Sequence, residues 1–196
     1  RHLVLPQVGP SGQEKLSASR VLLAGLGGLN SPVALYLASA GIGTLGLVDF
    51  DRVDRSNLQR QVLYGESDVE TLKTEASRRS LQRSRPGLKT EIVDQRIDRS
   101  NAGWIVEGWD VVVDGTDNDR ARYALNEACV AAGIPLVYGA ALRFQGQASV
   151  FWPAQGENSP CFNCLFPEDQ AGDAPRCAEA GVLGVVPGLV GMVQAT

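Results

Sequence analysis

The stretch VLLAGLGGLNSPVALYLASAG, residues 21–41, joins an apolar run to a helical pattern through a glycine-rich turn. Gly25, Gly27 and Gly28 have no Cβ atoms, so the backbone N–H groups of such a loop can approach a phosphate, and the start of the next helix favours negative charge. Asn30 stands where a dinucleotide fingerprint has its third glycine, and we expect it to act as the N-cap of that helix. The motif predicts a nucleotide-phosphate site but leaves NAD, FAD and ATP open.

Short β-branched runs alternate with helical patterns along the rest of the chain, which is typical of βαβ units. The predicted parallel strands are Arg20–Ala24, Thr44–Val48, Lys89–Asp94, Val111–Asp114 and Leu136–Ala140, with Ala148–Trp152 as an antiparallel edge strand. The predicted helices are Gly12–Leu16, Ser31–Ser39, Leu72–Ser84, Asn101–Glu107 and Asp119–Ala132, the last ending at Gly133. The expected fold class is α/β: a doubly wound, mostly parallel Rossmann-like sheet with helices on both faces and an antiparallel edge extension.

Composition narrows the class of protein. A chain of 196 residues that is 44% hydrophobic is expected to form one domain. Its net charge of −4 and its lack of a long Lys/Arg block argue against a nucleic-acid partner. The apolar stretches fall short of the ~20 residues that span a membrane, and no secretory signal opens the chain. We therefore expect a cytoplasmic protein with reduced thiols.

Two features concern domain limits. Residues 153–176, rich in Pro, Gly, Asp and Glu, are predicted to be a flexible crossover loop that carries two cysteines. The chain stops at GLVGMVQAT, inside an apparent helix. We therefore expect residues 1–196 to be a single ATP-binding domain that is truncated at its C-terminus.

Three charged residues after the glycine loop bear on the ligand. Asp49 ends the second predicted strand, about 20 residues on, where a carboxylate can bind ribose hydroxyls; the alternative is a turn carboxylate. Arg60 and Lys73 supply cations from separate elements. A hydride-transfer enzyme has little need for them, whereas attack at the α-phosphorus of a triphosphate builds charge that they would neutralise.

The motif DGTDN, residues 114–118, follows the fourth predicted strand. Ligands of parallel sheets bind at this end, and a carboxylate of Asp114 or Asp117 could hold Mg²⁺ that bridges phosphates. The alternative is that Asp117 and Asn118 only cap the next helix, which does not exclude metal binding.

These motifs together resemble those of a known family. Segments of the chain match the ThiF/MoeB adenylyltransferases, bacterial relatives of ubiquitin-activating enzymes, in the family's order over nearly the whole length: RHLVLPQVG, GLGGL, ASAGIGTLGLVDFDRVDRSNLQRQ, DGTDN, VYGAALRFQGQASVF, CFNC and RCAEAGVLG. The resemblance implies a doubly wound fold and a homodimer. It also implies transfer of AMP from Mg·ATP to the C-terminal glycine carboxylate of a ubiquitin-like sulfur carrier ending in Gly-Gly.

The resemblance also implies residue roles. Asp49 would bind the ribose, Asp117 would be the magnesium ligand and catalytic carboxylate with Asn118 beside it, and Arg1 would reach into the site of the partner protomer. The remaining nucleotide contacts would come from Gly25, Gly27, Gly28, Ser56, Asn57, Leu58, Gln59, Arg60 and Lys73. Glu70 and Leu72 depart from a usual Gly and Pro, and the charge of Glu70 is expected to lower ATP affinity.

The cysteines divide by context. Cys161 and Cys164 have the spacing of half a zinc knuckle, and in the family a second Cys pair near the C-terminus completes a structural Zn²⁺ site. Cys177 follows Arg176 at a predicted helix start, where its thiol pKa would fall; some family members use this cysteine for covalent linkage to the carrier, and the alternative is a plain helix-start residue. Cys129 is interpreted as a core residue, as are Trp104 and Trp109.

The sequence therefore favours ATP-dependent adenylylation of a sulfur carrier for molybdopterin, thiazole or thio-modification biosynthesis. A catalytically weak, carrier-binding scaffold of the same family is one alternative, supported by Asn30 and Glu70. An NAD-dependent oxidoreductase is another, and the cations at Arg60 and Lys73 argue against it.

Overall fold

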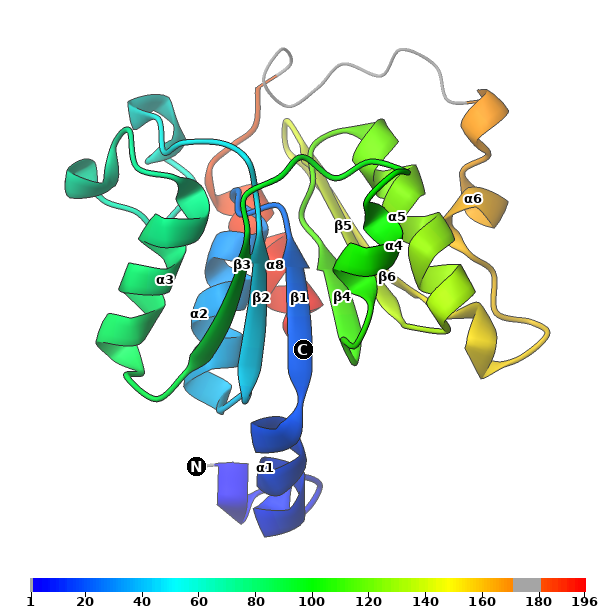
Figure 1. Ribbon diagram of the computed structural model, residues 1–196, viewed down its shortest axis with the longest axis horizontal. Helices are drawn as coiled ribbons and strands as arrows, with labels where there is room; N and C mark the ends of the chain where they lie inside the picture. Colours follow the sequence, from blue (N-terminus) through cyan, green and yellow to red (C-terminus); the bar gives the residue numbers. More distant parts are fainter. Residues whose placement is uncertain (1, 171–180) are drawn as a thin grey trace.

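The computed structural model describes residues 2–170 and 181–196. A six-stranded sheet of order β3-β2-β1-β4-β5-β6 forms its centre (Figure 1). The strands are β1 (Arg20–Ala24), β2 (Thr44–Val48), β3 (Lys89–Val93), β4 (Val111–Asp114), β5 (Leu136–Leu142) and β6 (Gln145–Phe151). The pairs among β1 to β5 are parallel and β6 is antiparallel to β5. The predicted fold class is confirmed.

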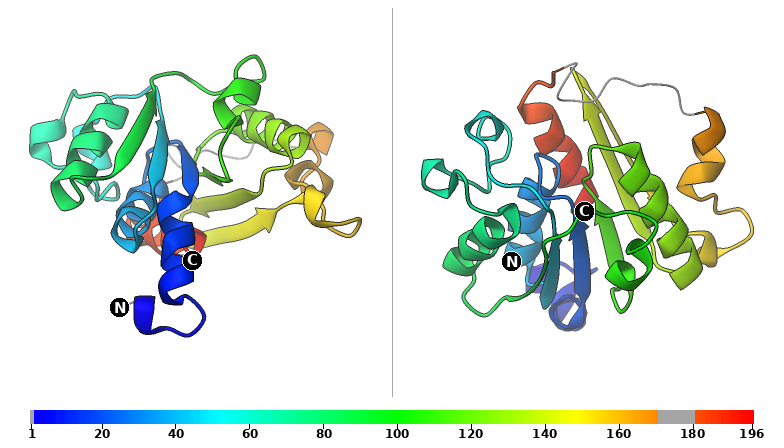
Figure 2. Two further views of the ribbon diagram at one scale, coloured as in Figure 1. Left: turned by 60° about the horizontal axis from the view of Figure 1, so that its bottom comes forward. Right: turned by 45° about the horizontal axis from the view of Figure 1, so that its top comes forward.

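Helices surround this sheet. The α-helices are α1 (Gly9–Ala18), α2 (Asn30–Ala40), α3 (Lys73–Ser84), α4 (Ala102–Val106), α5 (Asp119–Ala132), α6 (Phe162–Leu165) and α8 (Val185–Gln194). Short 3-10 helices are η1 (His2–Val4), η2 (Arg55–Asn57), η3 (Glu66–Asp68), η4 (Pro153–Gln155) and η5 (Glu168–Gln170). In the left view of Figure 2, α1 (dark blue) extends away from the sheet. In the described residues no helix is long and apolar enough to cross a membrane.

Apolar side chains fill both faces of the sheet. Leu22 and Val112 face α4 and α5, whereas Leu23 and Leu47 face α2 and α3. All four are buried. Strands covered on both faces read as unbroken apolar runs, which is why the bounds of β1, β2 and β4 could be predicted from sequence.

The crevice for a ligand follows from strand order. In the sheet, β2 and β3 lie on one side of β1, and β4, β5 and β6 lie on its other side, so the strand order reverses between β1 and β4. Ala24 and Asp114 are register partners, so the loops after β1 and β4 leave the sheet side by side. Ligands of open parallel sheets bind at this switch point.

Several predictions at the helix and strand ends were wrong or incomplete. Asn30 is not an N-cap: α2 has Leu29 in that position, and the Asn30 side chain is fully buried. Trp104 is not a core residue, since it is 51% exposed on α4, whereas Trp109 is buried as expected. Gly133 does end α5, with φ +70°.

The edge hairpin is longer than predicted. β5 continues to Leu142 and β6 begins at Gln145, so only Arg143 and Phe144 form the reversal. Within the predicted crossover loop, the described part contains η4, α6 and η5. Phe162 of α6 is buried against α5 and β5 in an aromatic cluster, which a Pro/Gly-rich composition does not reveal.

Candidate active site

The glycine loop after β1 contacts the loop after β4. Gly25 has φ +78°, and a Cβ there would lie 2.9 Å from the Gly115 carbonyl oxygen. A Cβ on Gly28 would lie 3.2 Å from Pro187 of α8 and 3.3 Å from Cγ of Arg60. The loop is therefore packed on three sides, and the Arg60 side chain lies against it.

Asn30 ties the two loops together. Its Nδ2 donates to the carbonyls of Gly25 at 2.7 Å, Ala24 at 3.1 Å and Val113 at 3.3 Å. These bonds join the end of β1 to β4 beneath the glycine loop. Asn30, which replaces the third glycine of the fingerprint, therefore links the two loops that border the crevice.

Asp49 lies at the end of β2, between the glycine loop and the segment that precedes α3. Its carboxylate accepts from the backbone N–H of Leu26 at 2.7 Å and of Asp51 at 2.9 Å. Burial raises the pKa of Asp49, and the charge of Lys73 opposes this rise. The hydrogen bond from Asp51 is the turn interaction that was the alternative to a ribose-binding role for Asp49. The hydrogen bond from Leu26 also places the carboxylate against the glycine loop.

Two cations follow β2 in the chain, Arg60 from the loop before α3 and Lys73 from the start of α3. Lys73, the first residue of α3, has a nearly buried side chain whose Nζ donates to Asp51 Oδ2 at 3.2 Å. Arg60 donates to the carbonyl of Ser56 at 3.3 Å. Asp49 thus has Lys73 as an electrostatic neighbour, while Arg60 adjoins Gly28.

The rest of the segment Ser56–Arg60 is held by local bonds. Asp54 accepts from the Ser56 backbone N–H at 2.8 Å, and Asn57 Oδ1 accepts from the Asp54 N–H at 3.4 Å, which forms a capping box. Leu58 packs on the core and Gln59 is exposed. This segment stands beside α8, because a Cβ on Gly184 would lie 2.6 Å from the Gln59 carbonyl oxygen.

The two carboxylates of DGTDN have different environments. Asp114 is fully buried and accepts from the Thr116 N–H at 2.8 Å, from Thr116 Oγ1 at 2.6 Å and from Arg122 Nε at 3.2 Å. Asp117 is exposed and makes no hydrogen bond or ion pair with the residues that the structure describes. Asn118 caps α5 through Ala121 N–H at 3.0 Å, as the alternative interpretation held. Asp117 is thus the carboxylate that remains free for a ligand.

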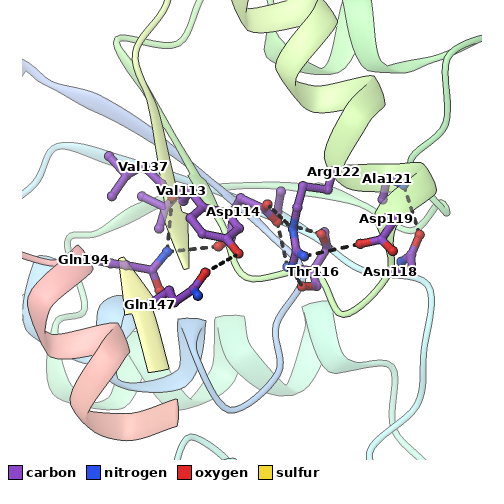
Figure 3. Close-up of polar contacts among 12 residues, drawn as sticks. Val113, Asp114, Thr116, Asn118, Asp119, Ala121, Arg122, Val137, Gln147 and Gln194 are labelled. Atoms are coloured by element: carbon purple, nitrogen blue, oxygen red, sulfur yellow. Dashed lines mark hydrogen bonds and ion pairs between the residues drawn. The ribbon is translucent and has the colours of Figure 1, made fainter. Parts of the chain in front are cut away.

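Arg122 is a site residue that the sequence did not reveal. It points from α5 toward Asp114 and Thr116 (Figure 3). Burial disfavours its charge, but Asp114, Tyr138 and Asp119 together outweigh this effect and raise the pKa of Arg122. Its position one helical turn after Asn118 is the only sequence signal that could have indicated it.

The cysteine pair lies apart from these loops, beside Asn126 in the middle of α5. The Sγ atoms of Cys161 and Cys164 are 3.4 Å apart, and Asn126 Nδ2 donates to Cys161 Sγ at 3.7 Å. Burial opposes the thiolate of Cys161, but hydrogen bonds from Cys164 and Asn126 lower its pKa. Among the described residues, no group of three or more His, Cys, Asp or Glu could hold a metal ion.

Cys129 is buried, and burial raises its pKa to about 12, so its interpretation as a core residue is confirmed.

Two predicted site residues, Arg1 and Cys177, lie outside the described residues.

Fold and site together define a nucleotide-binding domain of the doubly wound type, and comparison with known proteins specifies the family. The ThiF family profile matches residues 1–196. The chain is 48% identical to the SAMP-activating enzyme E1 of Haloferax volcanii, covering all of this chain and 72% of that protein. It is 46% identical to the sulfur carrier protein adenylyltransferase of Thermus thermophilus, covering all of this chain and 73% of that protein. The chain belongs to the ThiF family.

A solved structure shows the same fold. The Escherichia coli MccB structure with ATP superimposes with a TM-score of 0.78 at 24% identity, covering 93% of this chain and 55% of that one. At this identity the likeness shows only the fold.

Proposed function

We propose that this protein adenylylates the C-terminal glycine carboxylate of a ubiquitin-like sulfur-carrier protein ending in Gly-Gly. The observation that carries the proposal is the free carboxylate of Asp117 at the switch point, next to a glycine loop against which Arg60 lies. Family membership and the names of the archaeal and Thermus relatives support the same activity. The product would serve molybdopterin, thiazole or thio-modification biosynthesis.

The proposed reaction needs no general base, because the attacking carboxylate is already ionised at neutral pH. One carrier oxygen forms a bond to the α-phosphorus of ATP, the bond from that phosphorus to the bridging oxygen breaks, and pyrophosphate leaves with the electron pair. Arg60 and Lys73 would neutralise the charge that grows on the phosphates. The glycine loop, Asp49 and the Ser56–Arg60 segment would hold the nucleotide in line for attack.

The residues fit a magnesium ion. Proteins bind Mg²⁺ through one or two carboxylates together with substrate phosphates. Asp117 is exposed and unpaired among the described residues. The Asp114 carboxylate, in contrast, already accepts hydrogen bonds from Thr116 and Arg122. Asp117 would therefore hold the ion. When bound, Mg²⁺ would add charge neutralisation at the phosphates.

The cysteine pair fits half of a zinc site. Two neighbouring thiols, one with a lowered pKa, suit Zn²⁺, which takes four ligands in structural sites. We propose that Cys161 and Cys164 bind structural zinc with two ligands from outside residues 1–196. Metal analysis of a protein that extends beyond Thr196, with and without Cys161→Ser, tests this.

We also propose a homodimer in which Arg1 reaches the nucleotide site of the partner protomer. Large apolar side chains are exposed on the β5–β6 hairpin and on α8, and such surfaces mark protein interfaces: Phe144, Val150, Leu189 and Val193. Sedimentation of the wild-type protein and of Val150→Asp/Leu189→Asp would reveal the dimer and its loss.

The activity is tested by incubating the protein with Mg·ATP and a panel of carriers ending in Gly-Gly. Intact-mass measurement should find AMP attached to one of these carriers, and not to a version that lacks the terminal glycines. Carrier binding without AMP transfer would favour the scaffold alternative. A bound NAD absorbance in the purified protein would favour the oxidoreductase.

A further inference from the structure

We infer that Arg122 is a positioning residue of the proposed active site: its guanidinium fixes the peptide unit that joins Thr116 to Asp117 and thereby sets where the Asp117 carboxylate lies. The inference rests on the proposed function for the role of Asp117.

The contacts of Arg122 bracket the loop after β4. Its Nε donates to Asp114 Oδ2 at 3.2 Å, and one terminal nitrogen donates to the Thr116 carbonyl oxygen at 2.9 Å. The other terminal nitrogen lies 3.5 Å from Asp119 Oδ1. Because the Thr116 carbonyl belongs to the same planar peptide group as the Asp117 N–H, holding this oxygen fixes the backbone from which the Asp117 side chain projects.

The guanidinium itself has little freedom. The Arg122 side chain is 12% exposed, and its central carbon lies 5.0 Å from the ring centroid of Tyr138 and 5.9 Å from that of Phe162. A planar fork on an aromatic surface can hold a carboxylate and a carbonyl at once. An ammonium group on a flexible stem cannot reproduce this geometry.

The strand side of the loop is also anchored. The Nε2 atom of Gln194, on α8, donates to the carbonyls of both Asp114 at 2.9 Å and Val137 at 3.1 Å (Figure 3). Asp114 is thus held through its backbone by α8 and through its carboxylate by Arg122. In this loop Asp117 is the side chain left free to meet a ligand.

The test compares Arg122→Lys with a matched control, Arg99→Lys. Arg99 also lies beside α5, but it pairs with Glu127 and Glu168 on the surface and not with the loop. Two readouts are measured: carrier-dependent ATP–pyrophosphate exchange, and amide hydrogen exchange of residues 115–119 without substrate. The double variant Asp114→Asn/Arg122→Gln, which buries no charge, carries the test if Arg122→Lys does not fold.

Arg122→Lys should lower kcat by roughly 10²-fold, since small misplacements of a catalytic group cost this much, and KM for ATP should stay within about twofold. Amides 115–119 should exchange roughly tenfold faster while the amides of the sheet strands keep their protection. In an Asp117→Asn background, Arg122→Lys should cause little further loss, because both changes remove the same contribution. Arg99→Lys should behave as wild type.

The inference would be overturned if amides 115–119 exchanged at the wild-type rate in Arg122→Lys. It would also be overturned if Arg122→Lys lowered kcat as much in the Asp117→Asn background as in the wild type. Because the amide measurement uses no substrate, its outcome is separate from that of the proposed function. Loosened amides 115–119 in a protein whose wild type adenylylates no carrier would support the positioning of the loop and refute the activity.

Discussion

Asn30 occupies space that is available only because residue 115 is a glycine. A Cβ on Gly115 would lie 2.6 Å from Asn30 Nδ2, well inside van der Waals contact. The same nitrogen donates to the carbonyls of Gly25, Ala24 and Val113. The two positions, 85 residues apart in sequence (115 minus 30), form one packed unit beneath the proposed phosphate site.

This relationship predicts strong coupling between the two positions. Asn30→Gly should lower the free energy of unfolding by about 1–3 kcal/mol because the carbonyls that accept from Asn30 Nδ2 lose this buried donor. Gly115→Ala should also destabilise the wild type, yet add little in the Asn30→Gly background, where the clash is gone. Urea unfolding of the four proteins measures this cycle, and simple additivity would contradict the packing described.

Glu70 carries backbone strain. Its φ of +67° lies in the left-handed region that favours glycine. Glu70→Gly should raise the free energy of unfolding by about 1 kcal/mol, and removal of its charge should tighten ATP binding. Arg143, with φ +54°, provides the control: Arg143→Gly should relieve similar strain without changing ATP affinity, as calorimetry can show.

Lys73 should matter more for rate than for folding. Its removal leaves Asp51 half exposed and solvated but takes the cationic neighbour from buried Asp49, so Lys73→Met should lower the free energy of unfolding by about 1–3 kcal/mol. Exchange activity should fall roughly 10²–10³-fold, the loss typical of one electrostatic group in a preorganised site. Lys89→Met, on exposed β3, is the matched control and should retain activity. Parallel losses of rate and stability would argue for a purely structural lysine.

Cys129 should be inert in the folded protein. Because burial raises its pKa from 9.0 to about 12, almost no thiolate is present near neutral pH, and iodoacetamide should modify it only after unfolding. The folded pKa is the higher one, so its contribution to stability is constant below pH 9.0 and is lost as the pH rises toward about 12. Peptide mapping should find exposed Cys164 alkylated before Cys129, and rapid native labelling of Cys129 would contradict its burial.

The sequence predicted the parts of the fold that local pattern determines. β1 and β2 have their predicted bounds because both faces of these strands are buried, and α5 ends at Gly133 because the chain there adopts a left-handed turn. The same reasoning predicted the glycine loop and the loop after β4, since each follows a buried strand.

The errors have a common cause, which is dependence on distant neighbours. Asn30 was expected to cap α2, but its bonding partner Val113 comes from another strand and the room for it comes from Gly115. Trp104 is aromatic but lies on the exposed face of a helix too short to show a period. Arg122 was missed because only the burial of Asp114 and the aromatic cluster give it a role.

The central claim is tested most directly by carrier-dependent ATP–pyrophosphate exchange of Asp117→Ala. Asp117 is exposed and unpaired among the described residues, so the variant should unfold at the wild-type denaturant concentration, as should the control Glu14→Ala on α1. Its exchange rate should nevertheless be lower by roughly 10²-fold or more, while Glu14→Ala keeps full activity. Exchange by Asp117→Ala at a near-wild-type rate would contradict the assignment of this crevice as the site of adenylylation.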